Sequence, residues 1–208
     1  MSREFTMPDG APPTIPVVVI DDAGQAPGLA KALLAGGVRA IEVTLRTPAG
    51  LDAIAAIAKT APEIMLGAGT VLSPEDAQAA ANAGAQFLVS PGATDRLLEA
   101  AEATGLPLLP GAITASEVMR LKERGYRRLK FFPADAAGGV TALKGLAGPL
   151  PDISFCPTGG IGASNAATYL ALPTCFAVGG SWLAPTDAIR NGDWAKIEQL
   201  ARDAQSLA

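Results

Sequence analysis

The chain contains no histidine among its 208 residues. This absence excludes a serine–histidine–aspartate triad and removes the ligands that catalytic zinc sites almost always use. Proton transfer must therefore be carried by a carboxylate, a lysine, a tyrosine or water. We accordingly expect no metal site.

Cysteine is also scarce, with Cys156 and Cys175 each inside an apolar stretch and no CxxC motif. We expect two buried thiols in a reducing compartment and not a disulfide or redox pair.

No apolar run approaches the roughly 18 residues of a membrane helix, and the first residues lack the apolar core of a signal peptide. A net charge of −4 disfavours nucleic acid and anionic membranes as partners. We therefore expect a soluble, cytoplasmic protein.

What the sequence does contain is a regular alternation, after a polar lead-in over residues 1–14. Short apolar, β-branched runs predict strands at 15–20, 38–45, 63–68, 86–90, 106–109, 127–132, 153–157 and 174–178. Ala/Leu-rich stretches predict helices at about 26–36, 49–60, 74–83, 94–104, 115–124, 139–147, 163–171 and 194–206. The alternation predicts an α/β protein with a parallel sheet. Eight units at this length favour a single (β/α)8 TIM barrel over 15–208 rather than an open doubly wound sheet. Either arrangement places function at the carboxyl ends of the strands.

The predicted strand at 38–45 carries charges where a barrel interior is expected. In VRAIEVTLR, large apolar residues alternate with Glu42, Thr44 and Arg46. Because side chains alternate faces along a strand, the apolar set faces the helices and the polar set points inward. The alternative is an edge strand whose polar face is exposed to solvent, but a closed barrel has no edge strand. Two opposite charges inside a barrel indicate an ion pair or a functional site.

Lys130, in RRLKFFPA, is the only lysine in a predicted strand, because the other five fall in predicted helices. Alternation turns Leu129 and Phe131 toward the helices, and Lys130 and Phe132 inward. A lysine that reaches out to solvent from the strand end is the alternative. An amine in an apolar barrel beside an aromatic ring is suited to act as a nucleophile, with Glu42 within reach as a proton carrier.

Three glycine-rich segments follow predicted strands: GAGT at 67–70, TGGI at 158–161 and GGSW at 179–182. Glycines at such positions let backbone N–H groups approach an anion. The loops after strands seven and eight are the usual phosphate site of barrels. Ordinary turn glycines remain the alternative.

These segments occur in a specific order along almost the whole chain: EVTLRT (42–47), GAGTV (67–71), SPG (90–92), KFFPA (130–134), CPTGGI (156–161) and GGSW (179–182). In this respect the chain resembles the 2-keto-3-deoxy-6-phosphogluconate (KDPG) and 4-hydroxy-2-oxoglutarate (KHG) aldolase family. The resemblance implies a class I, metal-free aldolase on a (β/α)8 barrel, without a cofactor and usually a homotrimer. Such an enzyme cleaves KDPG to pyruvate and glyceraldehyde 3-phosphate in the Entner–Doudoroff pathway. Many members also split KHG to pyruvate and glyoxylate.

The resemblance also implies a role for each matching residue. Lys130 would form the Schiff base and Glu42 would carry protons. Other matching residues would hold the substrate carboxylate (Arg46, Thr70), line the pocket (Pro91, Phe132), meet a substrate hydroxyl (Thr158) and bind phosphate (Gly159, Gly160, Gly179, Gly180, Ser181). One departure is Asp21-Asp22, at a place where members often carry a basic residue.

Three other functions are compatible with parts of the pattern. An aldolase for a different 2-keto-3-deoxy sugar acid would keep the same reactive groups. A phosphosugar epimerase or isomerase would commonly need histidine or a metal. A non-catalytic phosphometabolite-binding barrel would retain the glycine loops but would have no reason to bury Lys130 with Glu42.

Overall fold

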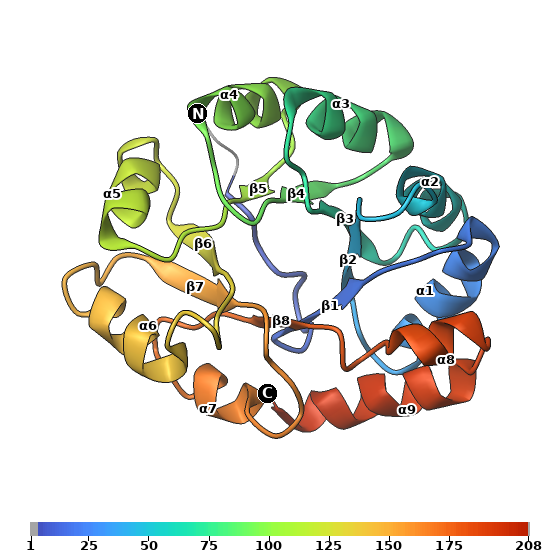
Figure 1. The fold of residues 1–208 in the computed structure, drawn as a ribbon. Coiled ribbons are helices and arrows are strands. Elements are labelled where there is room, and N and C mark those ends of the chain that lie inside the picture. Colours follow the sequence, from blue (N-terminus) through green and yellow to red (C-terminus); the bar gives the residue numbers. More distant parts are fainter. Residues whose placement is uncertain (1–3, 208) are drawn as a thin grey trace.

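The computed structural model describes residues 4–207, so residues 1–3 of the predicted lead-in and residue 208 of the predicted domain lie outside it. Strands and helices alternate along the chain (Figure 1). The strands are β1 (Thr14–Val18), β2 (Ala40–Thr44), β3 (Met65–Gly69), β4 (Phe87–Val89), β5 (Leu108–Leu109), β6 (Arg128–Phe131), β7 (Ser154–Pro157) and β8 (Val178–Gly180). The main helices are α1 (Ala26–Ala35), α2 (Gly50–Thr60), α3 (Pro74–Ala83), α4 (Asp95–Thr104), α5 (Ala115–Glu123), α6 (Gly139–Ala147), α7 (Ala166–Leu170), α8 (Thr186–Arg190) and α9 (Trp194–Asp203). Two 3-10 turns, η1 (Ala23–Gln25) and η2 (Ala204–Leu207), complete the set.

The strands form a curled, parallel α/β sheet of six members in the order β5-β4-β3-β2-β1-β8, and β6 pairs with β7 in a second parallel sheet. The prediction of one eight-stranded barrel is therefore confirmed only as far as this six-stranded sheet. Isolated bridges lie at the two junctions, where Gly111 meets Lys130 and Thr158 meets Gly179. Proline explains the short ladder at one junction: Pro107 and Pro110 flank the two-residue β5 and have no N–H to donate.

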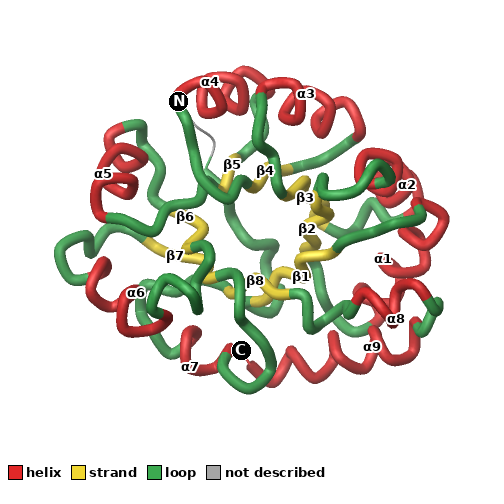
Figure 2. The backbone as a smooth tube through the Cα atoms, viewed as in Figure 1, coloured by secondary structure: helices red, strands yellow, loops and turns green. Residues whose placement is uncertain are grey.

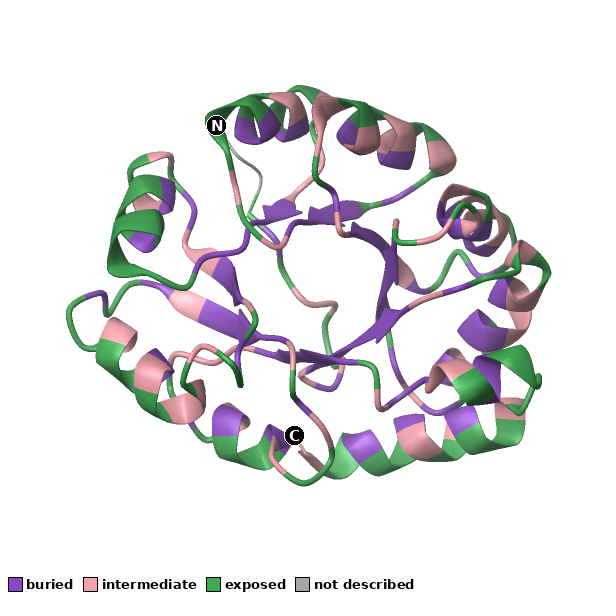
Figure 3. Ribbon diagram, in the orientation of Figure 1, coloured by how far each residue is buried: buried purple, intermediate pink, exposed green. Residues whose placement is uncertain are grey.

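The helices lie outside the strands (Figure 2), with buried faces turned inward and exposed faces turned to solvent (Figure 3). Three predicted helix starts are confirmed by side-chain caps: Ser73 accepts from the N–H of Asp76, Thr94 from Leu97, and Thr114 from Glu117. No helix within residues 4–207 is long and apolar enough to cross a membrane.

The buried apolar residues divide into two clusters, as strand alternation requires. The larger cluster lies between strands and helices and includes Ile41, Val43, Leu129 and Phe131. The smaller cluster contains Phe5, Ile15, Phe87, Val89, Leu109, Cys156 and Ala177. The prediction that the apolar residues of the second and sixth strands face the helices is confirmed.

The predicted polar lead-in nevertheless contributes to the core, because Phe5 is fully buried. Its ring centre lies 4.7 Å from that of Phe87 and 6.1 Å from that of Phe176. Arg128 donates a 3.0 Å hydrogen bond to the carbonyl of Phe5, and its guanidinium lies 5.1 Å from the centre of the Phe176 ring. Residues that precede β1 therefore supply part of the smaller core cluster.

The larger corrections to the predicted elements fall at the last strand, at the seventh helix and at two elements that were not predicted. The last strand is Val178–Gly180 instead of 174–178, because Gly179 and Gly180 pair with Ile15 and Pro16 of β1 and are strand residues, not a turn. The helix predicted at 163–171 is shorter, and α8 and η1 were not predicted. The five-residue α8 has no side-chain cap at Pro185, so its sequence carries none of the usual starting signals.

Candidate active site

A cavity of about 240 Å³ opens at the carboxyl ends of the strands. Seven of the predicted site residues line it: Arg46, Phe132, Thr158, Gly159, Gly160, Gly180 and Ser181. Four further residues, which were not predicted, complete the wall: Val17, Val19, Ile161 and Thr186. Strand alternation could have identified both: Val17 shares the inward face of β1 with Ile15, and Val19 continues the same alternation directly after the strand.

Lys130 and Glu42 form a buried ion pair, although they are 88 residues apart in sequence. The Lys130 amine lies 3.0 Å from one carboxylate oxygen of Glu42 and 3.3 Å from the other. Both residues are only 3% exposed. Lys130 is the single lysine in a strand of the described chain, as predicted, and β6 and β2 each direct their charged residue inward. The structure thus brings together the two residues on which the chemistry was expected to depend.

The surroundings of this pair are mostly apolar. The Lys130 amine lies 5.4 Å from the centre of the Phe132 ring, which also lines the cavity. Cys156 lies opposite Lys130 in the β6–β7 register, and burial raises the pKa of its thiol well above the ordinary value. The thiol therefore stays protonated and neutral, so Glu42 is the acidic group in direct contact with the amine.

Two glycines lie next to members of the pair, and their role was not apparent from the motifs. A Cβ at Gly69 would fall on the Glu42 carboxylate. A Cβ at Gly111, which bridges to Lys130, would fall on the carbonyl of Pro91. Both are positions where the backbone approaches a neighbour too closely for any side chain.

Arg46 and Thr70 meet at the rim of the site, as their predicted shared role requires. The Nε of Arg46 donates to the Thr70 hydroxyl at 3.1 Å. Arg46 follows the end of β2 and is exposed, so it lies above the strand rather than deep inside. Thr70 has a φ of 59°, the only positive value for a non-glycine residue among those described. A β-branched residue in this region is strained, which is common where side chains are held for binding.

The glycine segments are placed differently from the simple loops that were predicted. Gly67–Gly69 lie within β3 and Gly179–Gly180 within β8, whereas Gly159 and Gly160 do form a loop with φ values of 94° and 76°. The TGGI loop does not open a helix at 163, since α7 begins at Ala166. It nevertheless lies beside Gly180 and Ser181 in the cavity wall. Residues from two separate strand ends therefore line one space.

Five predicted residues do not line this cavity: Lys130, Glu42, Thr70, Pro91 and Gly179. The Lys130 amine lies 5.4 Å from the ring of Phe132, which does line the cavity, and Thr70 is bonded to Arg46. Gly179 lies against the Thr158 side chain, and the Pro91 carbonyl lies against Gly111. These positions form a second layer of the site beneath or beside the cavity wall.

The acidic pair after β1 does not act as a free negative patch. Asp21 accepts hydrogen bonds of 2.8 and 2.6 Å from Arg190 in α8. Asp22 accepts from the N–H of Gly24 and caps η1. Each carboxylate is therefore engaged within the protein, which weakens the repulsion that Asp21-Asp22 would exert on an anion in the cavity.

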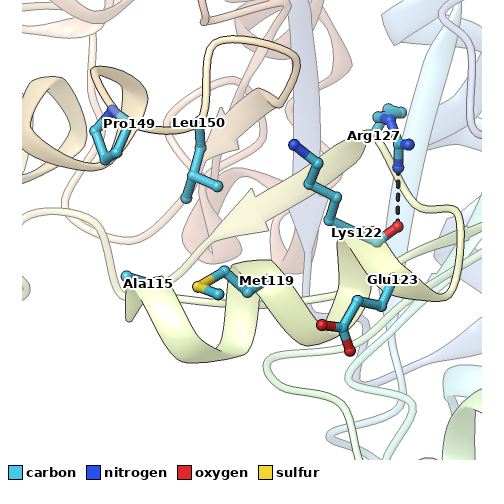
Figure 4. Close-up of a pocket in the computed structure, with 7 residues that line it drawn as sticks. All are labelled: Ala115, Met119, Lys122, Glu123, Arg127, Pro149 and Leu150. Carbon is cyan, nitrogen blue, oxygen red and sulfur yellow. Dashed lines mark hydrogen bonds between the residues drawn. The ribbon is translucent and has the colours of Figure 1, made fainter.

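A larger cavity of about 470 Å³ lies elsewhere, against α5 (Figure 4). Its lining includes Met119 and Leu150, and its cations are engaged: Lys122 with Asp152 at 2.7 Å, and Arg127 with the Lys122 carbonyl at 3.0 Å. It lies on the outer side of the fold and lacks a nucleophile with a partnered base. Residues 4–207 also contain no cluster of three or more side chains suited to hold a metal ion.

Parallel strands that place a buried lysine against a carboxylate, near a cavity lined by glycines and hydroxyl side chains, define a class of enzymes that use an amine as the nucleophile toward a carbonyl substrate. Comparison with known proteins specifies the family. The family described as KDPG and KHG aldolase matches residues 10–200. The chain belongs to this family.

Individual relatives agree with this assignment. The KHG/KDPG aldolase of Escherichia coli (strain K12) is 52% identical over 192 residues, which cover 92% of this chain and 90% of that protein. The KDPG aldolase of Legionella pneumophila, solved with pyruvate captured at low pH as a covalent carbinolamine intermediate, is 45% identical with a TM-score of 0.91, covering 93% of this chain and 94% of that one. The KDPG aldolase of Zymomonas mobilis ZM4, solved with 3-phosphoglycerate, is 44% identical with a TM-score of 0.89, covering 94% and 92%.

Proposed function

We propose that this protein is a class I aldolase that cleaves KDPG to pyruvate and glyceraldehyde 3-phosphate through a Schiff base on Lys130. The observation that carries the proposal is the buried contact of 3.0 Å between the Lys130 amine and the Glu42 carboxylate. A related enzyme has been trapped with pyruvate as a covalent carbinolamine, which is the intermediate this chemistry requires.

The first half of the reaction forms the imine. Glu42 takes a proton from the Lys130 ammonium, and the neutral amine attacks the keto carbon of the substrate. Glu42, through a water, returns protons as the carbinolamine loses its hydroxyl as water. The product is a protonated imine that links Lys130 to carbon 2 of the substrate.

The second half breaks the carbon–carbon bond. The C4 hydroxyl gives its proton to the Glu42 carboxylate, through a water, as the C3–C4 bond breaks, and the bonding pair moves into the imine to give an enamine. The aldehyde leaves, Glu42 protonates carbon 3 of the enamine, and water hydrolyses the imine to release pyruvate. The imine nitrogen accepts the electron pair throughout, so the proposed reaction needs no metal or organic cofactor.

The remaining residues bind the two ends of the substrate. Arg46 and Thr70 hold the carboxylate next to the keto group, Phe132 and Pro91 line the reacting carbons, and Thr158 meets a hydroxyl. The backbone of the glycine segments and the Ser181 hydroxyl bind the distal phosphate (Gly159, Gly160, Gly179, Gly180). A related enzyme solved with 3-phosphoglycerate supports a phosphate-bearing ligand.

KHG cleavage is a second proposed activity. KHG shares the keto acid end with KDPG and therefore the contacts to Lys130, Glu42 and Arg46. A relative that is 52% identical carries the name KHG/KDPG aldolase, which supports both substrates.

We also propose the architecture and setting in which this site works. The bridges of Gly111 with Lys130 and of Thr158 with Gly179 support closure of the eight strands into one (β/α)8 barrel. Residues 15–208 would form the catalytic domain, with Phe5 of the lead-in added to its core. The unpaired thiols of Cys156 and Cys175 support a reducing cytoplasm. A homotrimer follows from the family resemblance, and sedimentation at working concentration tests it.

Borohydride reduction in the presence of pyruvate is the direct test of the central proposal. We expect one reduced pyruvyl adduct, located by peptide mass mapping on Lys130. The helical lysines, such as Lys59 and Lys144, provide internal controls and should remain unlabelled. Labelling of a different lysine, or no labelling, would refute the Schiff-base mechanism for this chain.

A further inference from the structure

The first residue of α8 adds a hydroxyl side chain to the cavity wall. Thr186, the first residue of α8, lines the same cavity as Ser181, Gly159 and Gly160. The residue is partly buried, so its side chain belongs to the wall and is not fully solvated. Thr186 lines the cavity, whereas Lys130 and Glu42 do not.

The polar side chains of the site differ in whether they already form a hydrogen bond within the protein. Thr158 donates to the Cys156 carbonyl at 3.4 Å, and Thr70 accepts from Arg46 at 3.1 Å. Within residues 4–207, by contrast, the hydroxyls of Ser181 and Thr186 form no hydrogen bond to another residue. Two residues whose hydroxyls are free to bond a ligand thus line the cavity together with glycines of the two segments.

An ion pair holds α8 in place at this wall. Arg190, at the end of α8, donates two hydrogen bonds to Asp21 of the segment after β1. The side chain of Gln25 also donates to the Arg190 carbonyl at 3.1 Å. The only acidic residue of α8, Asp187, lies 3.6 Å from the Lys196 amine. Thr186 is therefore held in a fixed position next to a carboxylate that is already paired.

We propose that Thr186 is a specificity-determining residue that donates a hydrogen bond to the distal phosphate of the substrate, alongside Ser181. This inference rests on the proposed function, and it names a residue that neither the motifs nor the predicted elements indicated. The hydroxyl selects the phosphorylated keto acid because KDPG can accept this bond and KHG has no group that reaches it. A hydrogen bond to a charged group is stronger than one to a neutral group, so its loss is measurable.

The test compares substrates within each variant. Thr186→Val keeps the branched shape and removes the hydroxyl, whereas Thr186→Ser keeps the hydroxyl. We expect Thr186→Val to lower the ratio of kcat/KM for KDPG over KHG by roughly tenfold or more, mainly through KM for KDPG. Thr186→Ser should restore most of the ratio. Thr168→Val, in the exposed part of α7, is the matched control and should leave the ratio unchanged.

Calorimetric titration with inorganic phosphate provides a readout that needs no turnover. We expect Thr186→Val to bind phosphate more weakly than the wild type and Thr186→Ser to bind it nearly as well. An unchanged ratio and unchanged phosphate binding in Thr186→Val would overturn the proposal, as would equal effects of Val and Ser. If instead the wild type forms no pyruvate adduct on Lys130, the proposed function fails, while the phosphate titration still decides the role of Thr186.

Discussion

Replacing Glu42 with glutamine isolates the proton-carrying role of the buried pair. Glutamine keeps the length and one oxygen acceptor for the Lys130 amine, which lies 3.0 Å and 3.3 Å from the two carboxylate oxygens. It can neither accept a proton from the amine nor return one to the enamine. Because general acid–base catalysis contributes about 10²–10⁴-fold, we expect kcat to fall by that factor. Borohydride trapping of pyruvate should persist at a lower rate, because the amine itself remains.

The same substitution has a calculable effect on stability. Both members of the pair are 3% exposed, and removal of one partner from such a pair costs up to about 3–5 kcal/mol. The exposed pair Arg96–Glu75, at 3.4 Å, is the matched control, since breaking it costs about 0–1 kcal/mol. Denaturant unfolding of Glu42→Gln and Glu75→Gln gives this comparison directly.

A double variant removes both buried charges of the pair. Lys130→Met leaves the Glu42 carboxylate buried without a partner, whereas Glu42→Gln combined with Lys130→Met leaves no buried charge at the site. The double variant should therefore be more stable than the sum of the two single effects predicts. Near-wild-type turnover and an unchanged trapping rate in Glu42→Gln would refute the reasoning and assign proton transfer to another group or to water.

Four further predictions follow from the same structure. Ser181→Ala should lower kcat/KM for KDPG relative to KHG by roughly ten- to a hundredfold, and equal losses on both substrates would place Ser181 outside the phosphate site. Gly69→Ala should lower kcat because the new Cβ displaces the Glu42 carboxylate; full activity would show that the contact is not required. Exhaustive chelation should leave activity intact, and loss with recovery on adding a divalent ion would reverse the class I assignment. Burial raises the pKa of the Cys175 thiol from 9.0 to about 12 and that of Cys156 in the same direction, so the folded chain keeps thiol protons that the unfolded chain loses above about pH 9. The free energy of unfolding should thus fall with rising pH by about 1.4 kcal/mol per unit per thiol, and denaturation of Cys175→Ala should show a smaller slope.

Strand alternation explains why so much of the site could be predicted from the sequence. Because side chains alternate between the two faces of a strand, the face of a charged residue follows from the positions of its apolar neighbours. This rule predicted that Glu42 and Lys130 point to the same side of the sheet. The observed ion pair confirms that they meet. The helix starts at Ser73 and Thr114 were equally predictable, because a cap is formed by residues only three positions apart.

What the sequence could not reveal depends on contacts between distant segments. Nothing local marks Gly69 as the neighbour of the Glu42 carboxylate, or Gly179 as the neighbour of Thr158. The last strand was misplaced because its glycines resemble a turn, whereas their strand conformation comes from pairing with β1, which is distant in sequence. Thr186 was missed because α8 has no capping side chain and is only five residues long.

The burial of Phe5 has a consequence for how the chain folds during synthesis. Its ring packs against Phe87 and Phe176, which lie in the middle of the chain and near its end. The β1–β8 pairing likewise joins the first strand to the last. A nascent chain that has not yet produced Phe176 therefore cannot complete these contacts, and exposes their apolar surface to solvent until it does. Folding of this domain should therefore be completed only after Phe176 and β8 have been synthesised, so Phe5 finds all its partners late.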